Sequence, residues 1–134
     1  MNVKINYITD GDIAGALSVI GKKPKNDIYY STGGGPEGVI VAAALSCYGG
    51  QIQGKLVLNA EEKIRAKKLG IKDFNKKYNI DDMVSGDVIF CASGVTSGDL
   101  ASGVKDLGNE FEVNTFALHK SQSIIKSVTN VYNK

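Results

Sequence analysis

One pattern occurs three times along the chain and limits the folds that it can adopt. Each copy has a run typical of a strand, then a loop with glycine and acidic residues, then a run typical of a helix. The copies place strands at residues 3–7, 27–30 and 87–92, and helices at residues 12–20, 36–48 and from residue 99 onward. Strands that alternate with helices are typical of an α/β fold.

The other segments add elements of a different kind. After a strand near residues 55–58, Asn59 and Glu62 have the spacing of a capping box and predict a helix start. A short helix is expected near residues 81–84, and alternation over residues 111–115 and 124–128 predicts a pair of strands. We therefore expect one domain over residues 1–134. Its fold class is α/β, with a mixed sheet, repeated strand-loop-helix units, a C-terminal pair of strands, and helices packed on the sheet.

Acidic residues follow the three early strands. If these strands lie parallel in one sheet, their loops meet at the same edge and bring together Asp10, Asp12, Glu37 and Asp99. Asp12 and Asp99 also suit the N-cap position of a helix, where such a residue contributes about 1 kcal/mol. Asp10 and Glu37 are explained less well by helix capping, so they are the stronger candidates for binding.

The composition excludes several classes of protein. The chain has 134 residues with 16 Lys and Arg against 14 Asp and Glu, a net charge of +2, which gives no basic surface for nucleic acid. No run approaches the roughly 18 apolar residues of a membrane span, and no apolar leader is visible, so we expect a cytoplasmic protein without a membrane partner.

Cys47 and Cys91 lie in apolar runs and are expected to be reduced and buried. His119 is isolated near a predicted turn and is expected to be solvated or locally hydrogen-bonded.

The segment GGGPEG, residues 33–38, raises a conflict of charge. Glycines between a strand and a helix bring backbone N–H groups against a phosphate, and the letters satisfy the dinucleotide pattern G-x-G-x-x-G. However, the loop carries the carboxylate of Glu37 where the pyrophosphate would arrive, and this repels the cofactor. No Gly-Lys-Ser/Thr follows, so a Walker loop is excluded.

A divalent cation resolves the conflict. Mg²⁺ and Mn²⁺ bind through one or two carboxylates together with phosphate oxygens and water, so Glu37 beside a phosphate-binding backbone suits a metal-bridged phosphate site. Asp10 and Asp12 suit sugar hydroxyls, because a carboxylate accepts hydrogen bonds and donates none.

Four segments resemble the class II fructose-1,6-bisphosphatases of bacteria, metal-dependent enzymes of gluconeogenesis and glycerol metabolism. TDGDIAGAL is similar to the family's D-G-D-[VI]-A-x-A-[IL] segment. GGGPEGVIVAAALSCYGGQIQGKL and DDMVSGDVIFCASGVTSGDL resemble two longer stretches of the family, and HKSQSIIKSV loosely follows its closing segment. The order and spacing of the four segments agree with the family.

The resemblance implies a phosphohydrolase that uses Mn²⁺ or Mg²⁺ to remove the 1-phosphate of fructose 1,6-bisphosphate. It makes Glu37 a metal ligand, and it places Asp10, Gly11, Asp12 and Gly34 in contact with the sugar bisphosphate. It assigns no catalytic residue of this chain.

The resemblance also implies that this chain corresponds to the C-terminal part of the family. The other metal-binding carboxylates would then lie in an N-terminal half, the chain alone would be inactive, and that half is an expected partner. Ser97 replaces an aspartate of the family, and Lys120 and Lys126 stand at arginine positions, where lysine offers only a point charge to a phosphate. We also expect a homo-oligomer. The alternatives are a Rossmann-like nucleotide-binding module without catalysis and an interaction subunit that only completes an oligomer.

Overall fold

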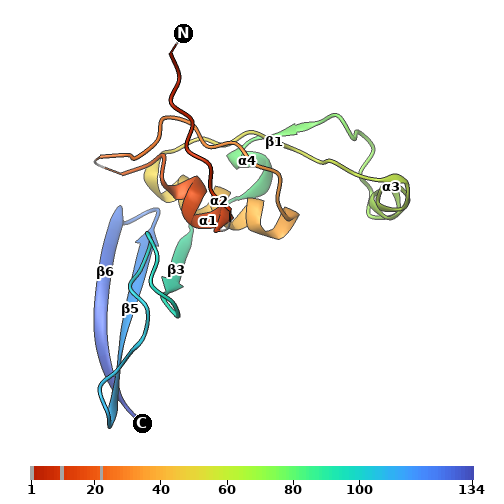
Figure 1. Ribbon diagram of the computed structural model, residues 1–134. Helices are drawn as coiled ribbons and strands as arrows, with labels where there is room; N and C mark the ends of the chain where they lie inside the picture. The colour runs from red at the N-terminus through yellow and green to blue at the C-terminus, as the bar shows by residue number, and fades with distance from the viewer. Residues whose placement is uncertain (1, 10, 22) are drawn as a thin grey trace.

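The computed structural model describes residues 2–9, 11–21 and 23–134, and in them a mixed α/β fold (Figure 1). Two helices and part of a sheet form a central body, from which the β5–β6 hairpin and the segment carrying α3 project in different directions. The elements in chain order are α1 (Asp12–Leu17), α2 (Gly35–Tyr48), β1 (Gly54–Lys55), α3 (Ala60–Lys68), β2 (Lys77–Tyr78), α4 (Ile80–Met83), β3 (Ile89–Ser93), β4 (Lys105–Asp106), β5 (Glu110–His119) and β6 (Ile124–Asn133).

The core lies where α1 and α2 pack against β3 and β5. Leu17 on α1 and Leu45 on α2 are buried with Phe90 on β3 and Leu118 on β5. Phe90 and Leu118 are direct partners across the β3–β5 ladder, so their side chains lie on the same face of the sheet. The sheet therefore presents one apolar face to the helices, as the sequence predicts.

Both sheets are antiparallel, so the predicted parallel arrangement is wrong. β5 is central in the larger sheet: it pairs with β6 along one edge and with β3 and β4 along the other. The smaller sheet pairs β1 with β2. The predicted strands at residues 3–7 and 27–30 are not assigned as strands in this chain. A dinucleotide fingerprint needs a parallel βαβ unit, and the described residues contain none.

The third predicted unit keeps its strand, β3, but the helix expected from Asp99 does not form. The segment instead folds back on itself: the Gly98 amide donates to the Ala101 carbonyl, and the Gly103 amide donates to the Ser97 hydroxyl over 3.0 Å. Serine and glycine favour such local turns because serine offers the backbone an alternative partner and glycine has no Cβ.

Several local predictions are confirmed. α2 ends at Tyr48, and Gly49 takes the left-handed conformation with φ 71°. Asn59 and Glu62 form the predicted capping box of α3. The short helix is α4, and the C-terminal strands form the β5–β6 hairpin. No helix in the described part of the chain is long and apolar enough to cross a membrane.

Candidate functional site

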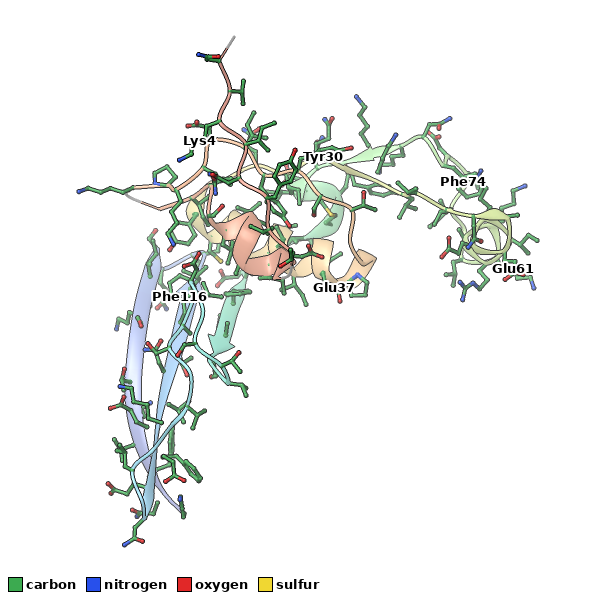
Figure 2. The ribbon with its side chains drawn as sticks, viewed as in Figure 1. Lys4, Tyr30, Glu37, Glu61, Phe74 and Phe116 are labelled. Carbon is green, nitrogen blue, oxygen red and sulfur yellow. The ribbon has the colours of Figure 1, made fainter. Side chains whose placement is uncertain are left out.

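Two carboxylates lie against two consecutive glycines at the start of α2. A Cβ atom on Gly33 would sit 2.6 Å from Oδ2 of Asp12, and a Cβ atom on Gly34 would collide with Oε2 of Glu37. Both side chains are exposed. The glycine loop therefore leaves room for two acidic side chains beside its backbone, and Figure 2 shows Glu37 at this end of the helix.

The same place holds the N-terminus of a 14-residue helix. Gly34 is the N-cap residue of α2 and provides no side-chain hydrogen bond to the first turn. The first N–H groups of a helix lack partners within the helix, and the dipole gives this end a partial positive charge. An anion is therefore favoured by the backbone, while the Glu37 carboxylate adds negative charge at the same point. A cation between the two charges makes the arrangement favourable.

Asp12 is placed by its neighbours and does not cap its helix. The N-cap residue of α1 is Gly11, with φ 84° and ψ 50°, and Asp12 is the first residue of the helix. The prediction of Asp12 as an N-cap is therefore wrong. Its Oδ1 accepts a hydrogen bond of 3.1 Å from the Tyr29 hydroxyl, and its other oxygen faces Gly33.

The predicted site residues thus divide into three groups. The fold brings Asp12, Gly34 and Glu37 to one place, with Gly11 immediately before Asp12. Asp10 lies outside the described residues. Asp99 pairs with Lys25: its Oδ1 accepts a hydrogen bond of 2.7 Å from the Lys25 ammonium group, and no helix begins at it. Asp99 was therefore wrongly predicted as an N-cap.

The described residues contain no group of three or more His, Cys, Asp or Glu side chains that could hold a metal ion. Glu37 could supply one metal ligand beside the first N–H groups of α2. A metal that is shared with phosphate oxygens and water takes only one or two carboxylates from the protein. A stable Mn²⁺ or Mg²⁺ site needs further carboxylates from outside these residues.

A second polar cluster, which the sequence did not reveal, joins β3 to the β5–β6 turn. Oδ2 of Asp87 accepts a hydrogen bond of 2.7 Å from the Ser121 hydroxyl and lies 2.7 Å from Nε2 of His119. The Ser121 and Val88 amides donate to Oδ1 of Asp87. The Ser121 hydroxyl, then His119, then these amides stabilise the carboxylate and hold the pKa of Asp87 well below its usual range. His119 is locally hydrogen-bonded, as predicted. No sequence pattern indicated Asp87, whose role is visible only from its contacts with His119 and Ser121 in the fold.

This cluster lacks the geometry of a nucleophilic triad. The hydroxyl and the carboxylate both lie at the same ring nitrogen, Nε2 of His119, whereas a triad places them at opposite nitrogens. We therefore interpret the cluster as a structural link between β3 and the hairpin turn.

A hollow of about 430 Å³ lies at the opposite end of α2 from Glu37. Its lining includes Gly49 and Gln51 after the helix, Asp81 on α4, and Lys120 in the hairpin turn. None of the predicted site residues lines it. It is an open polar depression and is separate from the candidate site.

The two cysteines differ in exposure. Cys47 on α2 is half-buried, and burial raises the pKa of its thiol. Cys91 on β3 is exposed, so the prediction that it is buried is wrong: side chains alternate between the two faces of a strand, and the preceding residue, Phe90, takes the face toward the helices. Both thiols are free.

Comparison with known proteins identifies the family. The family model described as bacterial fructose-1,6-bisphosphatase, glpX-encoded, matches residues 1–132. The chain belongs to this family. It is 32% identical over 133 residues to the fructose-1,6-bisphosphatase 2 class 2 of Escherichia coli (strain K12), a match that covers 88% of this chain and 41% of the relative.

A cyanobacterial relative agrees. The D-fructose 1,6-bisphosphatase class 2/sedoheptulose 1,7-bisphosphatase of Synechococcus sp. (strain JA-2-3B'a(2-13)) is 33% identical over 145 aligned positions, which cover 98% of this chain and 42% of the relative. The fructose-bisphosphatase family member described here thus spans about two fifths of the length of the curated relatives it matches.

Proposed function

We propose that this chain is one part of a metal-dependent sugar-bisphosphate phosphatase that hydrolyses the 1-phosphate of fructose 1,6-bisphosphate. The observation that carries the proposal is the packing of the Asp12 and Glu37 carboxylates against Gly33 and Gly34 at the N-terminus of α2. The family and the names of its members support the substrate. The proposal places the enzyme in the cytoplasm, in gluconeogenesis and glycerol metabolism.

Each site residue then has a role that its chemistry allows. Glu37 is a ligand of Mn²⁺ or Mg²⁺, and Gly34 lets the phosphate approach the helix N-terminus closely. Asp10, Gly11 and Asp12 contact the sugar, with the carboxylates accepting hydrogen bonds from its hydroxyls. Tyr29 holds Asp12 in orientation through its hydroxyl. A bound metal would neutralise charge on the phosphate and lower the pKa of a water molecule.

The part of the chain that the structure describes holds too few ligands for a complete site, so we propose that the chain is inactive without the remaining part of the family sequence. That part is the first expected partner, and homo-oligomerisation of the completed enzyme is the second. Neither nucleic acid nor a membrane is proposed as a partner.

The test is binding of the metal with the substrate. Mn²⁺ together with fructose 1,6-bisphosphate is expected to raise the Tm of the complex of this chain with the remaining part of the family sequence, and Glu37→Gln is expected to remove the rise while leaving the Tm of the complex without ligands unchanged. Stabilisation by NAD without any metal would instead support a nucleotide-binding module and overturn the proposal. Hydrolysis by the 134-residue chain alone at rates typical of enzymes would overturn the claim that the site is incomplete.

A further inference from the structure

The chain exposes far more surface than a compact protein of its mass. Its accessible surface is 10091 Å² for 14.2 kDa. A compact monomer of this mass exposes about 6,800 Å². The excess, roughly half as much again, is surface that a partner can cover.

Part of this surface comes from two extended segments, residues 2–9 and 27–33. Neither is assigned as a strand, and among the described residues no backbone hydrogen bond joins them to each other or to the rest of the protein. Figure 2 shows Lys4 and Tyr30 of these segments on the same side of the helices. Unpaired N–H and C=O groups along extended backbone can pair with another chain.

The segments are nevertheless held in position. The Asn6 amide donates a hydrogen bond of 3.0 Å to the side chain of Asn26, which in turn donates to the Ser18 hydroxyl. Ile8 and Tyr29 both pack where a Cβ on Gly15 would lie, 2.5 Å and 2.7 Å from their nearest atoms. The two segments are thus fixed beside α1 by side chains alone.

The same two segments carry large apolar side chains that are exposed. We define the docking surface as Val3, Ile5, Tyr7, Ile28 and Tyr30, which are 65% to 93% exposed. Within residues 3–8, Asn6 and Ile8, which contact the rest of the protein, alternate with these more exposed residues, with the period of two that is typical of a strand. Exposed large apolar side chains gathered on two neighbouring segments are typical of an interaction site.

α2 is also incompletely covered near the candidate site. The helix is apolar all round, and such a helix is normally buried on every side. Val39 and Ile40, in the turn after Glu37, are nevertheless 44% and 42% exposed. The prediction that α2 is buried on most sides therefore fails at the end that carries the candidate metal ligand.

We propose that the docking surface binds the part of a class II fructose-1,6-bisphosphatase that this chain does not contain, which adds strands to residues 2–9 and 27–33. The relatives carry more than half of their length outside the match, so the family contains a polypeptide large enough to cover this surface. The proposal rests on the proposed function in one respect: the partner is also the source of the missing metal ligands.

Residues 2–9 and 27–33 both lead to the candidate metal site, so docking on them would also affect that site. Residues 2–9 lead toward Asp12, and residues 27–33 lead to Gly34. Strands added to both segments would therefore end beside Glu37, where further carboxylates are needed. Docking and completion of the metal site are one event in this proposal.

The experiment is co-expression of the tagged chain with the part of the Escherichia coli relative outside the match. A one-to-one complex is expected, with slower amide hydrogen exchange in residues 2–9 and 27–33 than in the chain alone. The double variant Tyr7→Lys, Tyr30→Lys is expected to weaken the complex at least tenfold. The matched control is Val57→Lys, Val95→Lys, since both valines are well exposed outside the docking surface, and it is expected to bind normally.

A single-chain fusion of the two parts is the second measurement, because it does not depend on assembly of separate chains. Rapid exchange of residues 2–9 and 27–33 in the fusion would overturn the proposal, as would a complex unaffected by the Tyr7, Tyr30 double variant. Self-association of the chain through this surface, in preference to the partner, would also overturn it. Glu37→Gln is expected to dock normally. A complex of the unaltered chain that forms but neither binds Mn²⁺ nor hydrolyses fructose 1,6-bisphosphate would reject the proposed function and leave docking supported.

Discussion

The Glu37 carboxylate lies against the backbone of Gly34, in the space that any side chain at position 34 would occupy. Gly34 has φ −69° and ψ 148°, a conformation open to every residue, so backbone strain does not explain why glycine stands there. The space it leaves for Glu37 does. This relationship makes the two residues a single unit at the start of α2.

Gly34→Ala should therefore separate stability from binding. The new methyl group displaces only the far end of an exposed side chain, so the free energy of unfolding should change by less than about 1 kcal/mol in either direction. In the complex of this chain with the remaining part of the family sequence, binding of Mn²⁺ in the presence of fructose 1,6-bisphosphate should be lost, as measured by isothermal titration calorimetry. Gly35→Ala is the control, because nothing lies within 4 Å of its Cβ position. Equal loss in both variants would contradict the role of the Gly34–Glu37 contact.

Tyr29→Phe tests the orientation of Asp12. The variant keeps the ring against Gly15 and removes the hydrogen bond of 3.1 Å to the carboxylate. We expect a loss of about 0.5–1 kcal/mol in stability and a larger proportional loss in affinity for the sugar bisphosphate. Chemical denaturation and titration measure the two effects. Tyr30→Phe is the control, because the Tyr30 hydroxyl makes no hydrogen bond among the described residues, and it should change neither the stability nor the affinity. A normal affinity in Tyr29→Phe would show that binding does not depend on the hydrogen bond from Tyr29 to Asp12.

Asp87→Asn tests the link between β3 and the hairpin turn. The folded-state pKa of Asp87 lies below its unfolded value of about 3.9. Its stabilisation is therefore present in full above about pH 5 and is lost as the pH falls through the folded-state pKa. The variant should have a lower Tm at pH 7, and its difference from the wild type should shrink as the pH falls from about 5 toward 2. Thermal melts followed by circular dichroism across this range measure it, with Asp27→Asn as an exposed control; a difference independent of pH would count against the carboxylate.

Gly94→Ala tests the loop that replaces the expected third helix. A Cβ on Gly94 would collide with the backbone carbonyl of Ser102, which cannot move aside as a side chain can. A loss of roughly 1–3 kcal/mol in the free energy of unfolding is expected from this overlap. Gly98→Ala should be nearly neutral, because its Cβ position is open. If urea denaturation gives the two variants equal stability, the loop geometry described here is wrong.

The sequence could predict those parts of the candidate site whose residues lie close together along the chain. Gly34 and Glu37 belong to one loop and one helix turn, and their spacing alone indicated a phosphate site with a carboxylate in it. The hydrogen bond between Asp12 and Tyr29 could not be predicted from the sequence, because it joins residues 17 positions apart. The same holds for Asp87, whose partners Ser121 and His119 are more than 30 residues away.

The sequence by itself determined the elements that depend on neighbours within a few residues. These are the glycine end of α2, the capping box of α3, and the alternation of the β5–β6 hairpin. Only the tertiary structure decided the antiparallel sheet, the pairing of Asp99 with Lys25, and the absence of backbone pairing in residues 2–9 and 27–33 among the described residues. The physical reason is that strand pairing takes its hydrogen bonds from distant backbone. A strand pattern in the sequence therefore indicates that the segment can pair with another strand, but it does not indicate which strand that is.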